Sequence, residues 1–451
     1  MNEVNIIGAG LAGSEAAWQL AERDIQVNLY EMRPATSTPA HKTSNFAELV
    51  CSNSFRSDEK LTNAVGILHE ELRITNSLIM HSADRHQVPA GSALAVDRNL
   101  FSDEITKKIR NHKKIKIIYK EVESIPDEWE HVIIATGPLT SQSLSSFILK
   151  KNSQDSLYFF DAIAPIVYTE TVDMSKAWFQ SRYNKIGPSG SENDYINCPL
   201  NENQYNMFID DLIEAEKNNF NDWEKDTPYF DSCLPIEIMA LSGPQTLRHG
   251  PMKPFGLNNV HENGAEPYAV LQLRQDDIKG NLYNMVGFQT KIKYSHQTEI
   301  FRKIPGLNDA KFARLGGIHR NTYINSPLLL DRDLSLISDK RIKFAGQITG
   351  VEGYVESTSI GLVTALMTYN KIKGKHFNPP PSTSAIGSLI AYITRKDTIK
   401  NFQPMNVNFG LFDQVDTRDL RKLPKKIRDL KKKERLSNRA LEDIRTWIQN
   451  F

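Results

Sequence analysis

Cysteine, net charge and long hydrophobic runs are all scarce in this sequence. Three cysteines among 451 residues cannot build a disulfide framework, and their odd number favours a reducing compartment. Fifty-five Lys and Arg nearly balance 54 Asp and Glu, which excludes a uniformly basic nucleic-acid coat protein. No apolar run reaches the roughly 18 residues that span a bilayer, and the segment Met1 to Ile7 is too short for a signal peptide. We therefore expect a cytoplasmic protein without a membrane partner.

The length of the chain and its ordinary composition indicate two folded units. Hydrophobic residues make up 40% and charged residues 24% of the sequence, as in folded proteins. A chain of 451 residues exceeds what one hydrophobic core usually holds. The composition changes near residues 150 and 330, so we predict one domain from residues 1–150 and 331–451. A mixed α/β insertion domain is predicted over residues 151–330.

The first 33 residues contain the clearest motif. An apolar strand over residues 4–7 precedes a glycine turn, a helix over 14–21 and a second strand over 26–30, which Glu31 ends. In such a motif the first glycine makes the bend, the second exposes bare backbone to a pyrophosphate, and the third lets helix and strand pack closely. The helix N-terminus favours phosphate, and the terminal acid is placed to bind a ribose. The motif predicts a dinucleotide site, and a purely structural turn is the alternative. The residues of the turn are Gly8, Ala9, Gly10, Leu11, Ala12 and Gly13.

Two further features favour FAD over NAD as the dinucleotide. The buried strand over 131–137 and a late strand over 342–346 both end in glycine, and we expect both to join the first sheet from opposite ends of the chain. No second G-x-G-x-x-G occurs, so a nicotinamide would bind without a Rossmann domain of its own. The predicted fold class is therefore α/β, with a Rossmann-type, glutathione-reductase-like FAD-binding domain. An enzyme with NAD as its single cofactor is the alternative.

The cysteines do not form a recognisable pair in the sequence. Their spacing contains no C-x-x-C, which disfavours a dithiol redox motif and a zinc ribbon, and we expect no metal site. Cys51 lies among polar residues close to Arg56, surroundings that lower a thiol pKa. Cys233 lies in a turn-like segment and Cys198 in a short apolar one. The residues alone favour a small buried hydrophobe at each position.

A strongly basic segment precedes the C-terminus. Residues 418–435 contain ten cations and three acids, in contrast to the balanced remainder. Such a surface attracts a phosphate backbone, although a solvated helical face is an equally good interpretation. The candidate RNA-binding residues are Arg421, Lys422, Lys425, Lys426, Arg428, Lys431, Lys432 and Lys433.

Several long stretches resemble one family over nearly the whole chain. The sequence is similar to the bacterial folate- and FAD-dependent tRNA (uracil-5-)-methyltransferases, the TrmFO family, which are relatives of the GidA/MnmG flavoproteins. The glycine motif is common to many flavoproteins, whereas the stretches around Cys51 and Met405 separate this family from others. The similar stretches are residues 8–17, 30–34, 47–54, 89–91, 135–140, 346–354 and 401–406.

The resemblance implies cofactors, co-substrates and site residues. It implies FAD as cofactor, with 5,10-methylenetetrahydrofolate and NAD(P)H as co-substrates. It also implies that Cys51 and Cys233 are catalytic, with Cys233 as our first choice for the thiol that engages the uracil and Cys51 near the flavin, although the two roles could be exchanged. Gln347 stands where many flavoproteins carry an acid that holds the ribityl chain. Further cofactor-binding positions by this resemblance are Arg33, Gly137, Gly346, Gly350 and Gly353.

The activity that this resemblance implies is a one-carbon transfer to RNA. A methylene group would pass from the folate through the reduced flavin to carbon 5 of the T-loop uridine of tRNA, where reduction gives 5-methyluridine. Two alternatives stay open: the same chemistry on a uridine of 23S rRNA, and a non-catalytic flavin- and RNA-binding protein of the GidA type. No obligate protein partner is implied.

Overall fold

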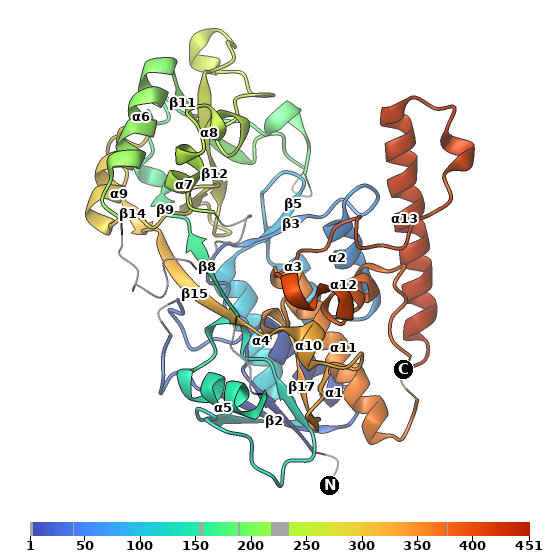
Figure 1. Cartoon of the computed structure of the whole chain (residues 1–451). Helices are drawn as coiled ribbons and strands as arrows, with labels where there is room; N and C mark the ends of the chain where they lie inside the picture. The colour runs from blue at the N-terminus through green and yellow to red at the C-terminus, as the bar shows by residue number, and fades with distance from the viewer. Residues whose placement is uncertain (1–2, 39, 153–156, 188–189, 218–233, 377) are drawn as a thin grey trace.

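The computed structural model describes residues 3–38, 40–152, 157–187, 190–217, 234–376 and 378–451. These residues form a lower body around a parallel sheet and an upper body around an antiparallel sheet (Figure 1). Two strands that pair with each other, β8 (Leu157–Ile163) and β15 (Gly317–Tyr323), run between the bodies. None of the helices described is both long and apolar enough to cross a membrane.

The sheet of the lower body is assembled from both halves of the chain. Its order is β16-β17-β7-β1-β2-β6, and only β16 runs antiparallel to its neighbour. The late strand β17 pairs with β7, which in turn pairs with β1, so the return of the chain to its first sheet is confirmed. The strands are β1 (Glu3–Ile7), β2 (Gln26–Glu31), β6 (Ile115–Tyr119), β7 (Val132–Ile134), β16 (Ser335–Leu336) and β17 (Asp339–Phe344).

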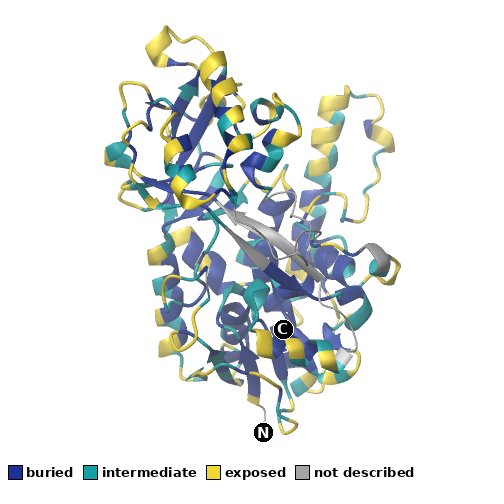
Figure 2. Ribbon diagram, turned by 60° about the vertical axis from the view of Figure 1, so that its left-hand side comes forward, coloured by how far each residue is buried: buried dark blue, intermediate teal, exposed yellow. Residues whose placement is uncertain are grey.

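Helices cover this sheet (Figure 2), and its central strands β1 and β7 are almost entirely buried, whereas the edge strand β6 is partly exposed. The closest approach is between α1 and α11, where an added Cβ on Gly361 would lie 2.3 Å from the Ala12 carbonyl oxygen. A small sheet of order β3-β5-β4 lies beside them. These elements are α1 (Leu11–Ala21), α2 (Ala64–Ile74), α3 (Leu78–Arg85), α4 (Arg98–Asn111), α5 (Gln142–Asn152), α10 (Ser326–Leu329), α11 (Tyr354–Ile372), α12 (Ala385–Ile393), α13 (Lys425–Ile448), β3 (Ser54–Ser57), β4 (Gln87–Val88) and β5 (Ala93–Val96).

The upper body is a second sheet with its own hydrophobic core. Its order is β10-β11-β12-β13-β9-β14, with antiparallel pairing throughout. All six strands fall within residues 151–330, and the division of the chain at those two residues stays a prediction. The elements are β9 (Ile166–Tyr168), β10 (Trp178–Phe179), β11 (Tyr195–Leu200), β12 (Ala269–Gln275), β13 (Leu282–Met285), β14 (Phe312–Arg314), α6 (Glu202–Glu214), α7 (Ile236–Leu241), α8 (Thr246–His249) and α9 (Tyr294–Phe301).

Local backbone geometry explains two differences from the sequence-based elements. The apolar spacing predicts one helix over 63–78, but α2 ends at Ile74 and α3 begins at Leu78. Asn76 adopts a φ of 56° between them, and the Ser77 side chain then caps α3 by accepting the Met80 N–H. The strand expected over 282–288 ends at Met285, because Gly287 has a φ of 78°.

Candidate active site

The glycine turn joins β1 to α1 at the carboxyl edge of the parallel sheet. Gly8 has a φ of 97°, which a side chain would disfavour. An added Cβ on Gly13 would lie 1.8 Å from the Gly8 carbonyl oxygen, whereas one on Gly10 would meet nothing within 4 Å. Gly8 therefore bends the chain, Gly13 permits close packing, and Gly10 leaves bare backbone facing open space, where binding of a pyrophosphate stays a prediction.

The N-terminus of α1 is free to bind an anion. Gly10 is its N-cap, and no side chain caps the helix. Unpaired N–H groups and the helix dipole at such an end attract phosphate. β1 pairs with β2 on one side and with β7 on the other, so the turn lies where the strand order reverses, the usual ligand position in open α/β sheets.

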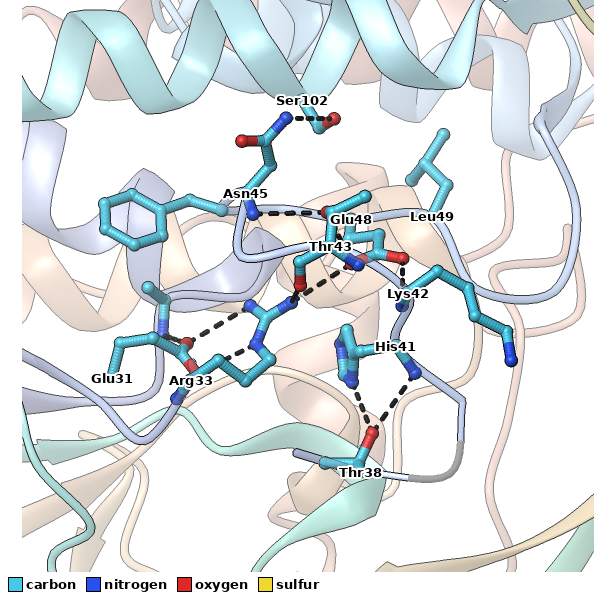
Figure 3. Close-up of polar contacts among 12 residues, drawn as sticks. Glu31, Arg33, Thr38, His41, Lys42, Thr43, Asn45, Glu48, Leu49 and Ser102 are labelled. Carbon is cyan, nitrogen blue, oxygen red and sulfur yellow. Dashed lines mark hydrogen bonds and ion pairs between the residues drawn. The ribbon is translucent and has the colours of Figure 1, made fainter. Parts of the chain in front are cut away.

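Glu31, at the end of β2, is fully engaged with its neighbours (Figure 3). Its Oε1 accepts bonds from the Arg33 backbone N–H (3.0 Å) and Nε (2.9 Å), and its Oε2 from the Ala9 N–H (3.1 Å) and Arg33 Nη2 (3.3 Å). Burial alone would raise the pKa of Glu31, but the hydrogen bonds and charge of Arg33 outweigh burial and lower it. Because a carboxylate accepts about four hydrogen bonds, a ribose hydroxyl at Glu31 must displace one, and the Nη2 bond is the longest.

Arg33 also ties β2 to the loop that follows it. Its Nη1 donates to the Thr43 carbonyl oxygen and to Glu48, each at 3.2 Å. Glu48 in turn accepts the Lys42 and Thr43 backbone N–H groups (Figure 3). Arg33 therefore shapes the loop over residues 42–48.

A cavity of about 580 Å³ opens on the glycine turn. We call it the turn cavity. Its wall combines the turn with the ends of β2, β6 and β7 and with the start of α5. Five of the predicted cofactor-binding residues line it: Gly8, Ala9, Gly10, Glu31 and Arg33.

A second cavity of about 1080 Å³ contains Cys51 in its wall. We call it the thiol cavity. Leu139 lines both cavities, so the two spaces adjoin at this residue. Arg274 reaches the thiol cavity from the upper body, and Gly353 and Tyr354 reach it from the lower one. The pair of cavities suits an extended ligand whose phosphates lie at the turn and whose other end lies beside Cys51.

Gln347 lies in the wall of the thiol cavity together with an acid. Its amide Nε2 donates to Glu352 Oε2 at 2.6 Å, and both residues line the cavity. Many flavoproteins carry an acid at the position of Gln347, and here Glu352 places a carboxylate beside the Gln347 amide.

Of the other predicted glycines, Gly346 and Gly350 permit close packing, and the carbonyl oxygen of Gly137 accepts a hydrogen bond from the Thr140 hydroxyl. An added Cβ on Gly346 would lie 2.7 Å from Ala12 Cβ, and one on Gly350 would lie 2.4 Å from the Phe402 ring. An added Cβ on Gly137 would meet nothing within 4 Å, and this residue has a φ of 64°. The wall of neither cavity includes Leu11, Ala12, Gly13, Gly137, Gly346 or Gly350.

Comparison with known proteins decides the family. A family model described as "Glucose inhibited division protein A" matches residues 3–376. The chain belongs to this family, GidA. It is 56% identical to a Rhodopseudomonas palustris protein named methylenetetrahydrofolate--tRNA-(uracil-5-)-methyltransferase TrmFO, over 99% of this chain and 96% of that one. It is 55% identical, with the same coverage, to a Brucella anthropi protein of that name. The TrmFO resemblance of the sequence is thereby confirmed.

The fold of this GidA-family chain matches a solved relative. The structure of Aquifex aeolicus GidA superposes with a TM-score of 0.68 at 14% identity, covering 99% of this chain and 74% of that one. The predicted α/β class with a Rossmann-type sheet is confirmed.

The three cysteines of this GidA-family chain have different settings. Cys51 is half-buried, and its backbone N–H donates to the Tyr354 hydroxyl at 3.0 Å. Cys198 is fully buried in β11, where burial raises its thiol pKa to about 12, so its assignment as a small core hydrophobe is confirmed. Cys233 lies outside the described residues.

The basic segment comprises the residues just before α13 and the first half of this helix, which projects from the lower body (Figure 1) and is exposed there (Figure 2). Arg418 and Arg435 pair with Asp416 and Asp419. No acid among the described residues forms an ion pair with the eight predicted RNA-binding cations. Six of the eight are exposed, while Arg428 and Lys432 are half-buried.

Sequence reasoning missed several residues of the site in this GidA-family member. Tyr354, Glu352, Arg274 and Leu139 line the cavities, and none was a predicted site residue. The first two fall inside the stretch 346–354 that carries the family resemblance, which was the available signal. Leu139 falls inside the stretch 135–140, which carries the same signal, whereas Arg274 had none, because it reaches the site only through tertiary contacts.

Proposed function

We propose that this protein transfers a methylene group from 5,10-methylenetetrahydrofolate to carbon 5 of a uridine in tRNA and reduces it to methyl. The observation that carries this proposal is the 56% identity, along almost the entire chain, to a relative named for that reaction. The net reaction balances with one NAD(P)H and one proton consumed: the folate leaves as tetrahydrofolate, and the uridine becomes 5-methyluridine. The T-loop uridine is the proposed target.

The residues present fit FAD. The open space over Gly10 and the uncapped start of α1 leave room and N–H groups for a pyrophosphate. The turn cavity and the thiol cavity lie on either side of Leu139, so the turn and Cys51 face neighbouring spaces. FAD, when bound, supplies the redox chemistry that carries the one-carbon unit and reduces it. Gln347, Glu352 and Gly353, in the wall of the thiol cavity, are placed to hold the end of the cofactor away from the phosphates.

A thiol is needed because carbon 5 of uracil is a poor nucleophile. Addition of a thiolate at carbon 6 makes carbon 5 an enolate carbon that can form the new bond. A base then removes the proton from carbon 5, and departure of the thiolate restores the double bond. We assign these tasks to Cys51 and Cys233, with Cys233 bonding carbon 6 and Cys51 acting beside the flavin. The position of Cys51 in the cavity wall supports the assignment.

The basic half of α13 is the proposed RNA contact. Its unpaired cations project from the body, and lysine and arginine on an exposed helix bind phosphates without selecting bases.

Methyl incorporation into defined RNAs tests the proposed function. Purified holoprotein with labelled methylenetetrahydrofolate and NAD(P)H should yield 5-methyluridine in a tRNA transcript, and C51A and C233A should each abolish it while tRNA binding persists. A transcript whose T-loop uridine is replaced by cytidine is the matched control. Label in 23S rRNA alone would move the target to rRNA. Tight flavin and RNA binding without product under all conditions would leave a binding protein and refute the enzyme.

A further inference from the structure

Two arginines hold the backbone around Cys51. Arg98 Nη1, from α4, donates to the Leu49 carbonyl oxygen at 2.8 Å. Arg314, at the end of β14, donates through Nη1 to the Val50 oxygen at 2.9 Å and through Nη2 to the Cys51 oxygen at 3.0 Å. Consecutive carbonyl groups therefore point toward cationic donors from two elements distant in sequence.

A third arginine holds the residues that follow. Arg274 Nη2, from β12, donates to Ser52 Oγ at 2.8 Å and to Asn53 Oδ1 at 3.1 Å. We call residues 49–53 the thiol segment. Three guanidinium groups, two from the upper body and one from the lower, thus converge on it.

The backbone of Cys51 is fixed at both of its polar groups. Its carbonyl oxygen binds Arg314, and its N–H binds the Tyr354 hydroxyl, which also accepts the Ser52 N–H at 3.1 Å. With both groups held, neither of the two peptide planes that flank the Cys51 Cα can rotate without breaking a hydrogen bond. The arginine and the tyrosine therefore fix the backbone position from which Cys51 lines the thiol cavity.

Two of these three arginines have no ion-pair partner in the described chain, and the charge of Arg314 interacts with Cys51. Arg98 pairs with Asp276, its Nη2 at 2.9 Å. No carboxylate of the described chain lies within ion-pair distance of Arg274 or Arg314. Burial, and then the charge of Arg98, lower the pKa of Arg314 to about 10, so its guanidinium still carries its charge at neutral pH.

Other titratable groups face the thiol segment. Arg56, from β3, lines the thiol cavity and pairs with the buried Glu356. Glu352 also lines the cavity. Tyr354, from α11, is neutral at physiological pH because burial raises its pKa. Together with the three arginines and Asp276, the described surroundings contain four arginines and three carboxylates.

We propose that Arg314, supported by Arg98, is a positioning residue that holds Cys51 as a thiolate directed into the thiol cavity. The inference rests on the proposed function insofar as Cys51 acts there as a reacting thiol. A cation close to a thiol favours the ionised form, and two carbonyl bonds to one guanidinium fix the backbone that carries the sulfur. Arg314 thereby performs two tasks, one of charge and one of geometry.

The pH dependence of Cys51 alkylation separates these tasks. Holoprotein without RNA or folate is labelled with iodoacetamide over a pH series, and mass spectrometry of the Cys51 peptide gives its rate apart from the other cysteines. In the wild type, the midpoint should fall below the value of about 8.5 of a free thiol. R314M should raise the midpoint by about one pH unit and slow labelling at neutral pH about tenfold. R314K keeps the charge but loses the paired contact with two carbonyl groups, so its midpoint should lie between those of the wild type and R314M.

R302M is the matched control. Arg302 Nε also donates to a backbone carbonyl, that of Ala310 at 3.0 Å, but it does not contact the thiol segment. In R302M, the pH dependence of Cys51 alkylation should coincide with that of the wild type. Flavin content and circular dichroism identify any variant that does not fold.

Two results would overturn the inference. One is a wild-type midpoint at or above that of a free thiol, a measurement that needs no variant. The other is a folded R314M whose profile matches the wild type, which would make Arg314 only a structural link. A depressed midpoint in a protein that never methylates RNA would instead refute the proposed function and keep the inference about Arg314.

Discussion

Alanine at Gly10 and alanine at Gly13 should affect this protein in opposite ways. Gly10 has a φ of −73°, which alanine accepts, and its added Cβ would meet no atom within 4 Å. We therefore expect G10A to change the free energy of unfolding of the apoprotein by no more than about 0.5 kcal/mol. The methyl group would instead occupy space above the turn, where we place the pyrophosphate. FAD affinity should fall at least about tenfold, or about 1.4 kcal/mol.

G13A places its methyl group inside packed backbone. The new Cβ would lie 1.8 Å from the Gly8 carbonyl oxygen and 3.3 Å from Ala135 Cβ. Relief requires α1 to move away from β1 by more than an ångström, yet α1 is held from behind by the close contact of Gly361 with Ala12. We expect a loss of about 1–3 kcal/mol or more in the free energy of unfolding.

Denaturant unfolding of the two apoproteins and titration with FAD measure these effects separately. The expected pattern is a stable G10A with weak flavin binding and a destabilised G13A. Wild-type FAD affinity in G10A would refute the placement of the phosphates over Gly10. Wild-type stability in G13A would refute the packing role of Gly13.

Three further predictions concern buried and exposed charges and the core thiol. Burial raises the pKa of Glu71 from 4.5 to about 8, so the folded state keeps a proton that the unfolded state releases. The free energy of unfolding should therefore fall by up to about 1.4 kcal/mol for each pH unit of increase between those two values. Denaturant titrations of E71Q should lack this dependence on pH. C198A should cost roughly 1–2 kcal/mol through lost core contacts and leave turnover per folded molecule unchanged; a fall in turnover would contradict the core assignment. Glutamine at four α13 lysines should weaken tRNA binding and reduce its salt dependence by up to about one power of salt concentration per lost phosphate contact, with flavin content unchanged. The α13 variant replaces Lys425, Lys426, Lys431 and Lys432. The control variant carries glutamine at four lysines near the end of α4 instead: Lys107, Lys108, Lys113 and Lys114.

Local patterns were sufficient for the elements that bear the nucleotide turn. The apolar strands over 4–7 and 26–30, the buried strand over 131–137 and the late strand over 342–346 all appear in one sheet. Their signals are short-range, because hydrophobic runs and glycine turns depend on neighbouring residues. The break at Asn76 was missed, since apolar spacing continues across it although the backbone does not.

The glycine turn, the family and the candidate thiols could be predicted from the sequence, because each depends on residues adjacent along the chain. That the acceptor sites of Glu31 are already occupied by Arg33 and Ala9 became visible only in the folded chain. Likewise, only the fold brings Arg274 and Arg314 to a segment more than 200 residues earlier. Long-range contacts of this kind leave no periodic trace in the sequence: the charge around Cys51 is set by where distant strands end.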